Sequence, residues 1–112
     1  MTSLKDIGSE AHAINQKNGW EVFTEQDWPQ HRADKEPVQK LCTHMALVHS
    51  EVSEATEAVR KIDRANFEEE LADVIIRVAS IAFGMGIDLG SAVETKLAVN
   101  ATRGLHHGGK TV

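Results

Sequence analysis

Residues 38–59 have the sequence VQKLCTHMALVHSEVSEATEAV. Apolar side chains recur in this stretch every three or four residues, which is the spacing that places side chains on one face of an α-helix. The apolar positions are Val38, Leu41, Met45, Val48, Val52, Ala55 and Val59. The stretch therefore predicts a long amphipathic helix of about six turns.

The rest of the chain predicts three more helices. One spans about residues 3–18 and ends at a glycine, and both prolines lie in the polar connector that follows it. Asp63 and Asp88 are suitable N-caps for a third and a fourth helix. No segment has the two-residue alternation that is typical of a strand. We therefore expect an all-α fold, a four-helix bundle in a single domain of residues 1–112, with a flexible tail at about 104–112.

The composition restricts the classes of function and the location. A formal net charge of -5 argues against a nucleic-acid binder, because phosphate contacts need a clustered basic surface. The single cysteine, Cys42, fits a reducing cytoplasm, and no apolar run reaches the length of about 18 residues that a membrane span needs. Aromatic residues make up only 4% of the chain, so four short helices would bury little apolar surface alone. We expect a cytoplasmic protein, without nucleic-acid or membrane partners, that completes its bundle as a homodimer or homotetramer.

Two pairs of acids interrupt the apolar patterns of the second and third helices. Glu51 and Glu54 form one pair, Glu70 and Asp73 the other, and residues three apart are neighbours on a helix surface. Helices joined by a link as short as residues 61–66 run antiparallel, which brings the two pairs nearly opposite each other. Carboxylates at such spacing repel one another unless a cation lies between them, and oxygen ligands suit Mg²⁺ or Mn²⁺ better than zinc. The pattern is compatible with a divalent-metal site and, as the alternative, with a solvated acidic face.

Several short motifs surround these acids at a defined order and spacing. They are LVHSEVSEA at 47–55, EELADVIIR at 69–77, GIDL at 86–89 and HGGK at 107–110, together with Gly19-Trp20, Lys96, Asn100 and Arg103. This set resembles the MazG-like nucleoside triphosphate pyrophosphohydrolases. It is most similar to their short, single-domain form found in phages and mobile elements.

The resemblance implies a reaction and a set of metal ligands. The implied reaction is Mg²⁺-dependent hydrolysis of a nucleoside or deoxynucleoside triphosphate to the monophosphate and pyrophosphate, in a nucleotide-pool house-cleaning role, with Mn²⁺ as a possible substitute. The implied catalytic and metal-binding residues are Glu51, Glu54, Glu70 and Asp73. Many family members carry a further acid where this chain has Ser50, so the resemblance gives no fifth carboxylate ligand. Glu54 or Glu57 is the candidate general base.

Substrate contacts are expected from residues outside the acidic pairs. Lys96, Asn100 and Arg103 share one stripe of the fourth helix. The resemblance implies that this stripe binds the triphosphate, whereas cations near a helix end are ordinarily complements to the helix dipole. Lys110, which follows two glycines, is expected to close over the substrate, with a frayed tail as the alternative. Trp20 is the candidate for stacking on the base, with packing as its alternative role.

Three residues have expected supporting roles. Asn15 and His31 are candidates for polar contacts with the base. Arg77, four residues after Asp73, is a candidate for orienting that carboxylate.

Two other functions compete with the nucleotide pyrophosphohydrolase. One is a non-catalytic helical oligomerisation or regulatory module whose acids face solvent. The other is a phosphohydrolase that acts on different pyrophosphate compounds.

Overall fold

The structure of the chain is a computed structural model that describes residues 2–103. Those residues form four α-helices and one short 3₁₀ turn, and no strand occurs among them. The elements are α1 (Leu4–Lys17), η1 (Glu25–Asp27), α2 (Lys35–Arg60), α3 (Arg64–Gly84) and α4 (Leu89–Arg103). The predicted all-α class with four helices is confirmed, and η1 is an addition within the polar connector. The predicted tail at about 104–112 lies outside the described residues.

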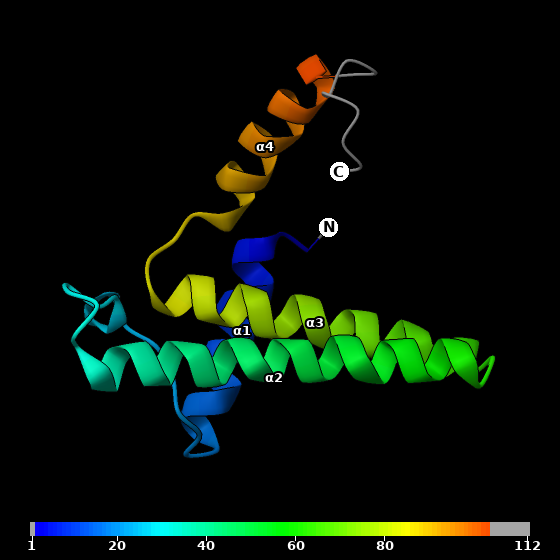
Figure 1. Cartoon of the computed structure of the whole chain (residues 1–112), viewed down its shortest axis with the longest axis horizontal. Coiled ribbons are helices and arrows are strands. Elements are labelled where there is room, and N and C mark those ends of the chain that lie inside the picture. Colours follow the sequence, from blue (N-terminus) through cyan, green and yellow to red (C-terminus); the bar gives the residue numbers. More distant parts are fainter. Residues whose placement is uncertain (1, 104–112) are drawn as a thin grey trace.

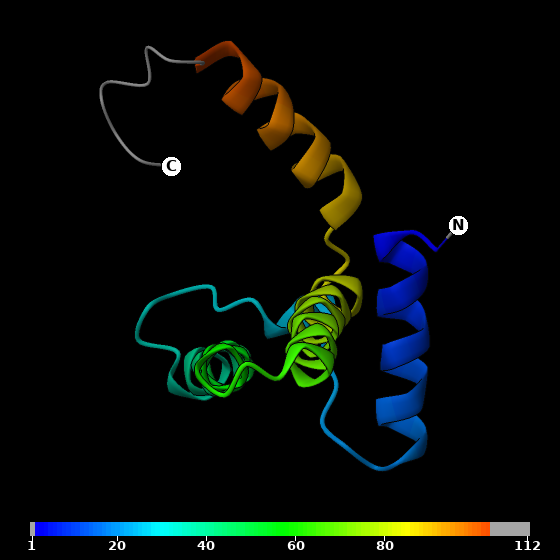
Figure 2. The same ribbon diagram turned by 90° about the vertical axis from the view of Figure 1, so that its right-hand side faces the viewer.

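The helix α3 lies at the centre of the fold. It packs against α2 on one side, as an antiparallel hairpin, and against α1 on the other (Figure 1, Figure 2). The chain turns by 114° between α3 and α4, so α4 extends away from the hairpin (Figure 1). Among the described residues, no single helix is long and apolar enough to span a membrane, and only the bent pair of α3 and α4 meets that criterion together.

The helix ends follow from local sequence. The side chain of Asp63 accepts a hydrogen bond from the backbone N–H of Asn66 at 3.0 Å, and Asp88 accepts one from Ser91 at 3.0 Å. Both predicted N-caps are therefore confirmed. The hydrogen bonds from Ser91 hold the pKa of Asp88 below its ordinary value. At the other end of α3, Gly86 has a φ of 73° and lets the chain leave the helix in a left-handed conformation.

Two glycines allow close contacts around α3. A Cβ atom on Gly8 of α1 would lie 2.8 Å from the Cβ of Phe83, so α1 approaches α3 closely only because this side chain is absent. A Cβ atom on Gly84 would lie 2.9 Å from the Cβ of Phe23, which is 4% exposed. The segment between α1 and η1 is therefore seated directly on the end of α3.

The same segment is also attached to α2. Lys40 donates a hydrogen bond to the backbone oxygen of Val22 at 2.8 Å and pairs with Asp27 at 3.0 Å. Burial disfavours the charged form of Asp27, but hydrogen bonds from Thr24 and the pairing with Lys40 outweigh it and lower its pKa. This segment carries Trp20, so its position relative to α2 and α3 is fixed by specific contacts.

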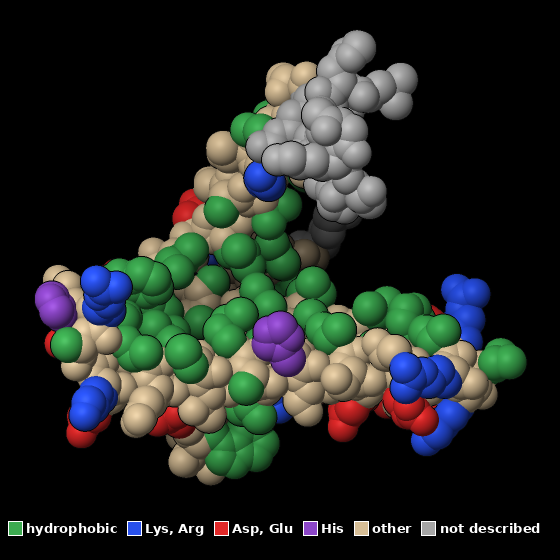
Figure 3. Space-filling view, viewed as in Figure 1, with side chains coloured by type: hydrophobic (Ala, Val, Ile, Leu, Met, Phe, Trp, Pro, Cys, Tyr) green, Lys and Arg blue, Asp and Glu red, His purple; other side chains and the backbone are tan. Residues whose placement is uncertain are grey.

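The apolar face of α2 is only partly covered. Val48 and Ala55 are buried against α3, whereas Met45, Val52 and Val59 are 46%, 47% and 58% exposed. Figure 3 shows apolar side chains gathered at the surface along α2 and α3 and around the base of α4. The reason is that α3 alone packs along the length of α2 within the described part of the chain.

Candidate functional site

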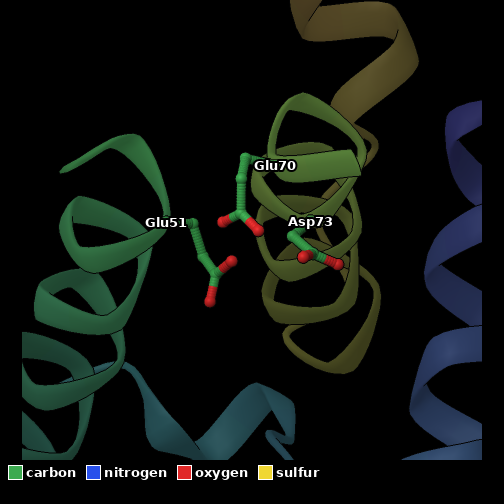
Figure 4. Close-up of side chains that lie close together, drawn as sticks. All are labelled: Glu51, Glu70 and Asp73. Atoms are coloured by element: carbon green, nitrogen blue, oxygen red, sulfur yellow. The ribbon is translucent and has the colours of Figure 1, made fainter. Parts of the chain in front are cut away.

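Three acids from the α2–α3 hairpin meet on the facing sides of the two helices. Glu51 comes from α2, and Glu70 and Asp73 come from successive turns of α3 (Figure 4). One oxygen atom of each carboxylate lies within 4.8 Å of the other two. The antiparallel hairpin therefore brings together three of the four carboxylates that the sequence pairs.

The fourth acid, Glu54, lies at the edge of this cluster. Its side chain is exposed, and it lies close enough to Glu70 to raise the pKa of that acid through hydrogen bonding and through its charge. Glu54 thus contacts the cluster through Glu70, without being one of the three acids that converge on a single point. Ser50 and Glu57 are both exposed on α2.

Glu70 is the acid that is most affected by its surroundings. It is only 9% exposed, and its Oε2 atom is buried without a hydrogen-bond partner among the described residues. The hydrogen bond with Glu54, burial, and the charges of Glu54, Glu51 and Asp73 raise its pKa to about 7. Each cause disfavours the charged form of Glu70, and a cation at this point would reverse the effect.

The donor set fits a hard divalent cation. All the converging atoms are carboxylate oxygens, the ligands that Mg²⁺ and Mn²⁺ prefer. The buried Oε2 of Glu70 is a polar atom without a hydrogen-bond partner among the described residues, and a bound cation would satisfy it. Glu51, Glu70 and Asp73 could therefore hold a metal ion.

Arg77 provides a positive charge next to the cluster. Its Nε donates a hydrogen bond to Oε1 of Glu51 at 3.3 Å, and the side chain of Glu51 is 13% exposed. The sequence suggested that Arg77 orients Asp73, the acid on its own helix. Instead, Arg77 reaches across to α2, because it lies one turn beyond Asp73 on the side of α3 that faces α2.

A pocket of about 530 Å³ opens beside the acids. Its walls come from α1, α2, α3 and the segment that follows α1. The residues that line it are Asn15, Trp20, Glu21, Phe23, His44, Leu47, Glu51, Asp73, Ile76, Arg77, Ser80 and Ile81. This volume lies within the range of pockets that enclose a small ligand, from about 300 to 1,000 Å³. Arg77 is the one lysine or arginine among these described lining residues.

The candidate substrate residues are divided between this pocket and α4. Trp20 and Asn15 line the pocket, and Trp20 is 63% exposed. Lys96 and Asn100 lie on α4, away from the hairpin, and do not line it. Arg103 is the last residue of α4 and its side chain lies outside the described part, as does Lys110 with the whole predicted lid. His31 is exposed in the connector and does not line the pocket.

Three polar residues of the pocket were not among the predicted site residues. His44 precedes Glu51 by seven residues on α2, and Ser80 follows Asp73 by seven residues on α3. Seven residues are about two helical turns, so helical spacing from the acids would have placed both side chains on the acidic face. Glu21 is adjacent to Trp20, and only the path of the chain after α1 brings it to the pocket.

Comparisons with known proteins place the chain in a family. The model of the MazG nucleotide pyrophosphohydrolase domain matches residues 39–106, which is more than half of the chain. The match includes most of α2 and all of α3, and therefore all four paired acids. No curated protein and no solved structure matches the chain. The chain belongs to the MazG nucleotide pyrophosphohydrolase family.

Proposed function

We propose that this protein hydrolyses nucleoside or deoxynucleoside triphosphates to the monophosphate and pyrophosphate, with Mg²⁺ or Mn²⁺ as cofactor. The observation that carries this proposal is the convergence of Glu51, Glu70 and Asp73 beside a pocket of about 530 Å³. Membership of the MazG family supports the class of reaction. A house-cleaning role in the nucleotide pool follows as part of the same proposal.

The acids have separate roles in this proposal. Glu51, Glu70 and Asp73 would hold the divalent ion, with Glu54 beside Glu70. When bound, such an ion supplies neutralisation of phosphate charge and a lower pKa of the attacking water. Glu70 would lose its proton when it holds the metal ion, because a carboxyl group must be ionised to act as a metal ligand.

Glu54 is the better of the two candidate general bases. A water oxygen forms the new bond to the α-phosphorus, the bond from that phosphorus to the bridging oxygen breaks, and pyrophosphate leaves. The proton of the water passes to a carboxylate. Glu54 is exposed and contacts the cluster through Glu70, whereas Glu57 is one turn further away and pairs with Arg60 at 3.5 Å.

Arg77 is the candidate phosphate-binding residue within the same chain. It lines the pocket and is close to Glu51, and a guanidinium can bind two phosphate oxygens at once. Glu51 would help to hold the divalent ion, and the guanidinium of Arg77 beside it would bind the triphosphate.

A direct assay tests the proposed function. The protein is incubated with Mg²⁺ and each common nucleoside and deoxynucleoside triphosphate, pyrophosphate is measured, and the nucleotide product is identified by chromatography. We expect pyrophosphate and monophosphate in equal amounts, and a higher KM for Arg77→Gln. No pyrophosphate from any nucleotide would remove the enzyme proposal and leave the non-catalytic oligomerisation module. A diphosphate product with release of inorganic phosphate would indicate a different phosphohydrolase.

We further propose that the chain acts as a homo-oligomer in which α4 of one copy approaches the acidic pocket of another. Three observations support this proposal. α2 exposes part of its apolar face, and Val93, Leu97 and Val99 of α4 are 40%, 61% and 40% exposed. Lys96 and Asn100 belong to α4, which extends away from the hairpin (Figure 1), and they do not line the pocket of their own chain. A second copy would cover these apolar surfaces and bring the stripe of α4 to a triphosphate.

Mixing two inactive variants tests the shared site. Asp73→Asn lacks an acid, and Lys96→Ala lacks a cation of the α4 stripe. If α4 serves the pocket of another copy, mixed oligomers contain some sites with neither defect, so the mixture should recover part of the parent activity. Light scattering of the parent should show a dimer or tetramer. A monomer, or a mixture no more active than its components, would contradict the arrangement.

A further inference from the structure

The residues that line the pocket extend along the α2–α3 hairpin, with the acids toward one end. His44 and Glu51 are two turns apart on α2, and Asp73 and Ser80 are two turns apart on α3. Seven residues at 1.5 Å per residue give about 10 Å between the two ends. This is comparable to the reach from the α-phosphate of a nucleotide across its sugar to the base. A triphosphate held at the acids would therefore place its base near His44 and Ser80.

The middle of the pocket is apolar. Leu47 from α2 and Ile76 from α3 lie between the two ends and are 37% and 42% exposed. The indole of Trp20 lies on the rim, exposed over most of its surface. Apolar walls and an accessible aromatic ring suit a flat base and its sugar, but they do not distinguish one base from another.

The far end of the pocket presents hydrogen-bond acceptors. Asn15 lines the pocket and donates through its Nδ2 to the Oγ of Ser80 at 3.4 Å, so its carbonyl oxygen remains as an acceptor. His44 Nε2 lies 2.7 Å from Oε1 of Glu21, so the imidazole donates and the second carboxylate oxygen of Glu21 is left as an acceptor. Within the described residues, neither remaining oxygen has a hydrogen-bond donor.

The segment that carries Glu21 is held in place before any ligand binds. Phe23, two residues beyond Glu21, is buried against the end of α3 and packs edge-on to the ring of His44 with centroids 4.7 Å apart. The ammonium of Lys40 lies 4.7 Å from the centre of the same Phe23 ring. A group fixed in this way loses little freedom when it contacts a ligand.

We propose that this end of the pocket selects nucleotides whose base carries an exocyclic amino group, such as cytosine and adenine, over their oxo counterparts. An amino group donates to the free oxygens of Asn15 and Glu21. A carbonyl oxygen at the same place would meet two acceptors, one of them a carboxylate, and leave all three without donors. This selectivity rests on the proposed nucleotide pyrophosphohydrolase function.

Two matched pairs of substrates test the selectivity. dCTP and dUTP differ in the amino or oxo group at one position of the pyrimidine, and dATP and dITP differ in the same way on the purine. We expect kcat/KM to favour the amino nucleotide by about 10-fold or more in each pair, the size of one hydrogen bond to a charged group. Glu21→Gln should reduce both ratios, because an amide can turn its N–H toward a carbonyl. Glu10→Gln, an exposed charge change on α1, is the matched control and should leave both ratios unchanged. Equal rates in both pairs, or ratios that Glu21→Gln does not alter, would overturn the proposal.

A binding measurement separates this proposal from the proposed reaction. Calorimetric titration of the parent with dCMP and with dUMP should show tighter binding of dCMP by a similar factor. Glu21→Gln should reduce the difference between the two affinities. A preference for dCMP without release of pyrophosphate from any triphosphate would retain the selectivity and reject the reaction. Equal affinity for the two monophosphates, or no binding of either, would reject the selectivity even if triphosphates are hydrolysed.

Discussion

Asp73→Asn is expected to lower kcat/KM for triphosphate hydrolysis by about 10²–10³-fold or more, the loss seen when one group that stabilises transition-state charge is removed. Asp73 contributes one of the three carboxylate oxygens that lie within 4.8 Å of one another, and asparagine preserves its shape while removing its charge. Glu51→Gln should have a similar effect, since Glu51 completes the same cluster from α2. Initial rates of pyrophosphate release at saturating Mg²⁺ and at nucleotide concentrations well below KM, compared with those of the parent, measure the loss.

A neighbouring acid provides the matched control for both variants. Glu69 is exposed on α3, directly before Glu70, and is not one of the converging acids. Glu69→Gln changes the net charge by the same amount and should keep the parent's activity. Circular dichroism should show the same helix content in all four proteins. If Asp73→Asn were as active as Glu69→Gln, the cluster would not be the catalytic centre.

Much of the fold could be predicted from the sequence because its signals are local. Helical spacing predicted α2, and the backbone N–H groups three residues beyond Asp63 and Asp88 donate to these two side chains, which confirms both caps. The short link between α2 and α3 imposes an antiparallel hairpin, so the meeting of Glu51 with Glu70 and Asp73 could also be inferred.

The remaining features depend on contacts that sequence spacing does not specify. The exposure of Met45, Val52 and Val59 depends on which helices cover α2, and within residues 2–103 only α3 packs along it. The direction of α4, and with it the distance of Lys96 from the pocket, depends on the 114° turn after α3. The position of Glu21 depends on how the segment after α1 is seated on α3, which no periodic pattern encodes.

Stability of the metal-free protein should fall as pH rises across the titration range of Glu70. The unfolded chain binds the proton with the ordinary pKa of 4.5, and the folded protein binds it more tightly, with a pKa of about 7. The contribution of the proton to stability is therefore fully present below about pH 4.5 and is lost as pH rises through about 7. In the presence of a chelator, the Tm of the parent should decrease over this range relative to that of Glu70→Gln, whose amide has no proton to lose.

Mg²⁺ should reverse this loss, and the comparison with Glu70→Gln decides whether Glu70 is a ligand or only a buried acid. At a pH about one unit above 7, Mg²⁺ at about 100 times its Kd should raise the Tm of the parent by on the order of 10 °C, because the ion binds only the folded site. The gain should shrink as pH falls through about 7, where the proton competes for Glu70. Without metal, Glu70→Gln should be at least as stable as the parent at the higher pH, since it removes repulsion from Glu54, Glu51 and Asp73. Mg²⁺ should raise the Tm of Glu70→Gln by much less than it raises the Tm of the parent. A variant that is less stable without metal yet is stabilised by Mg²⁺ as much as the parent would show that Glu70 has a packing role and that the ion binds elsewhere.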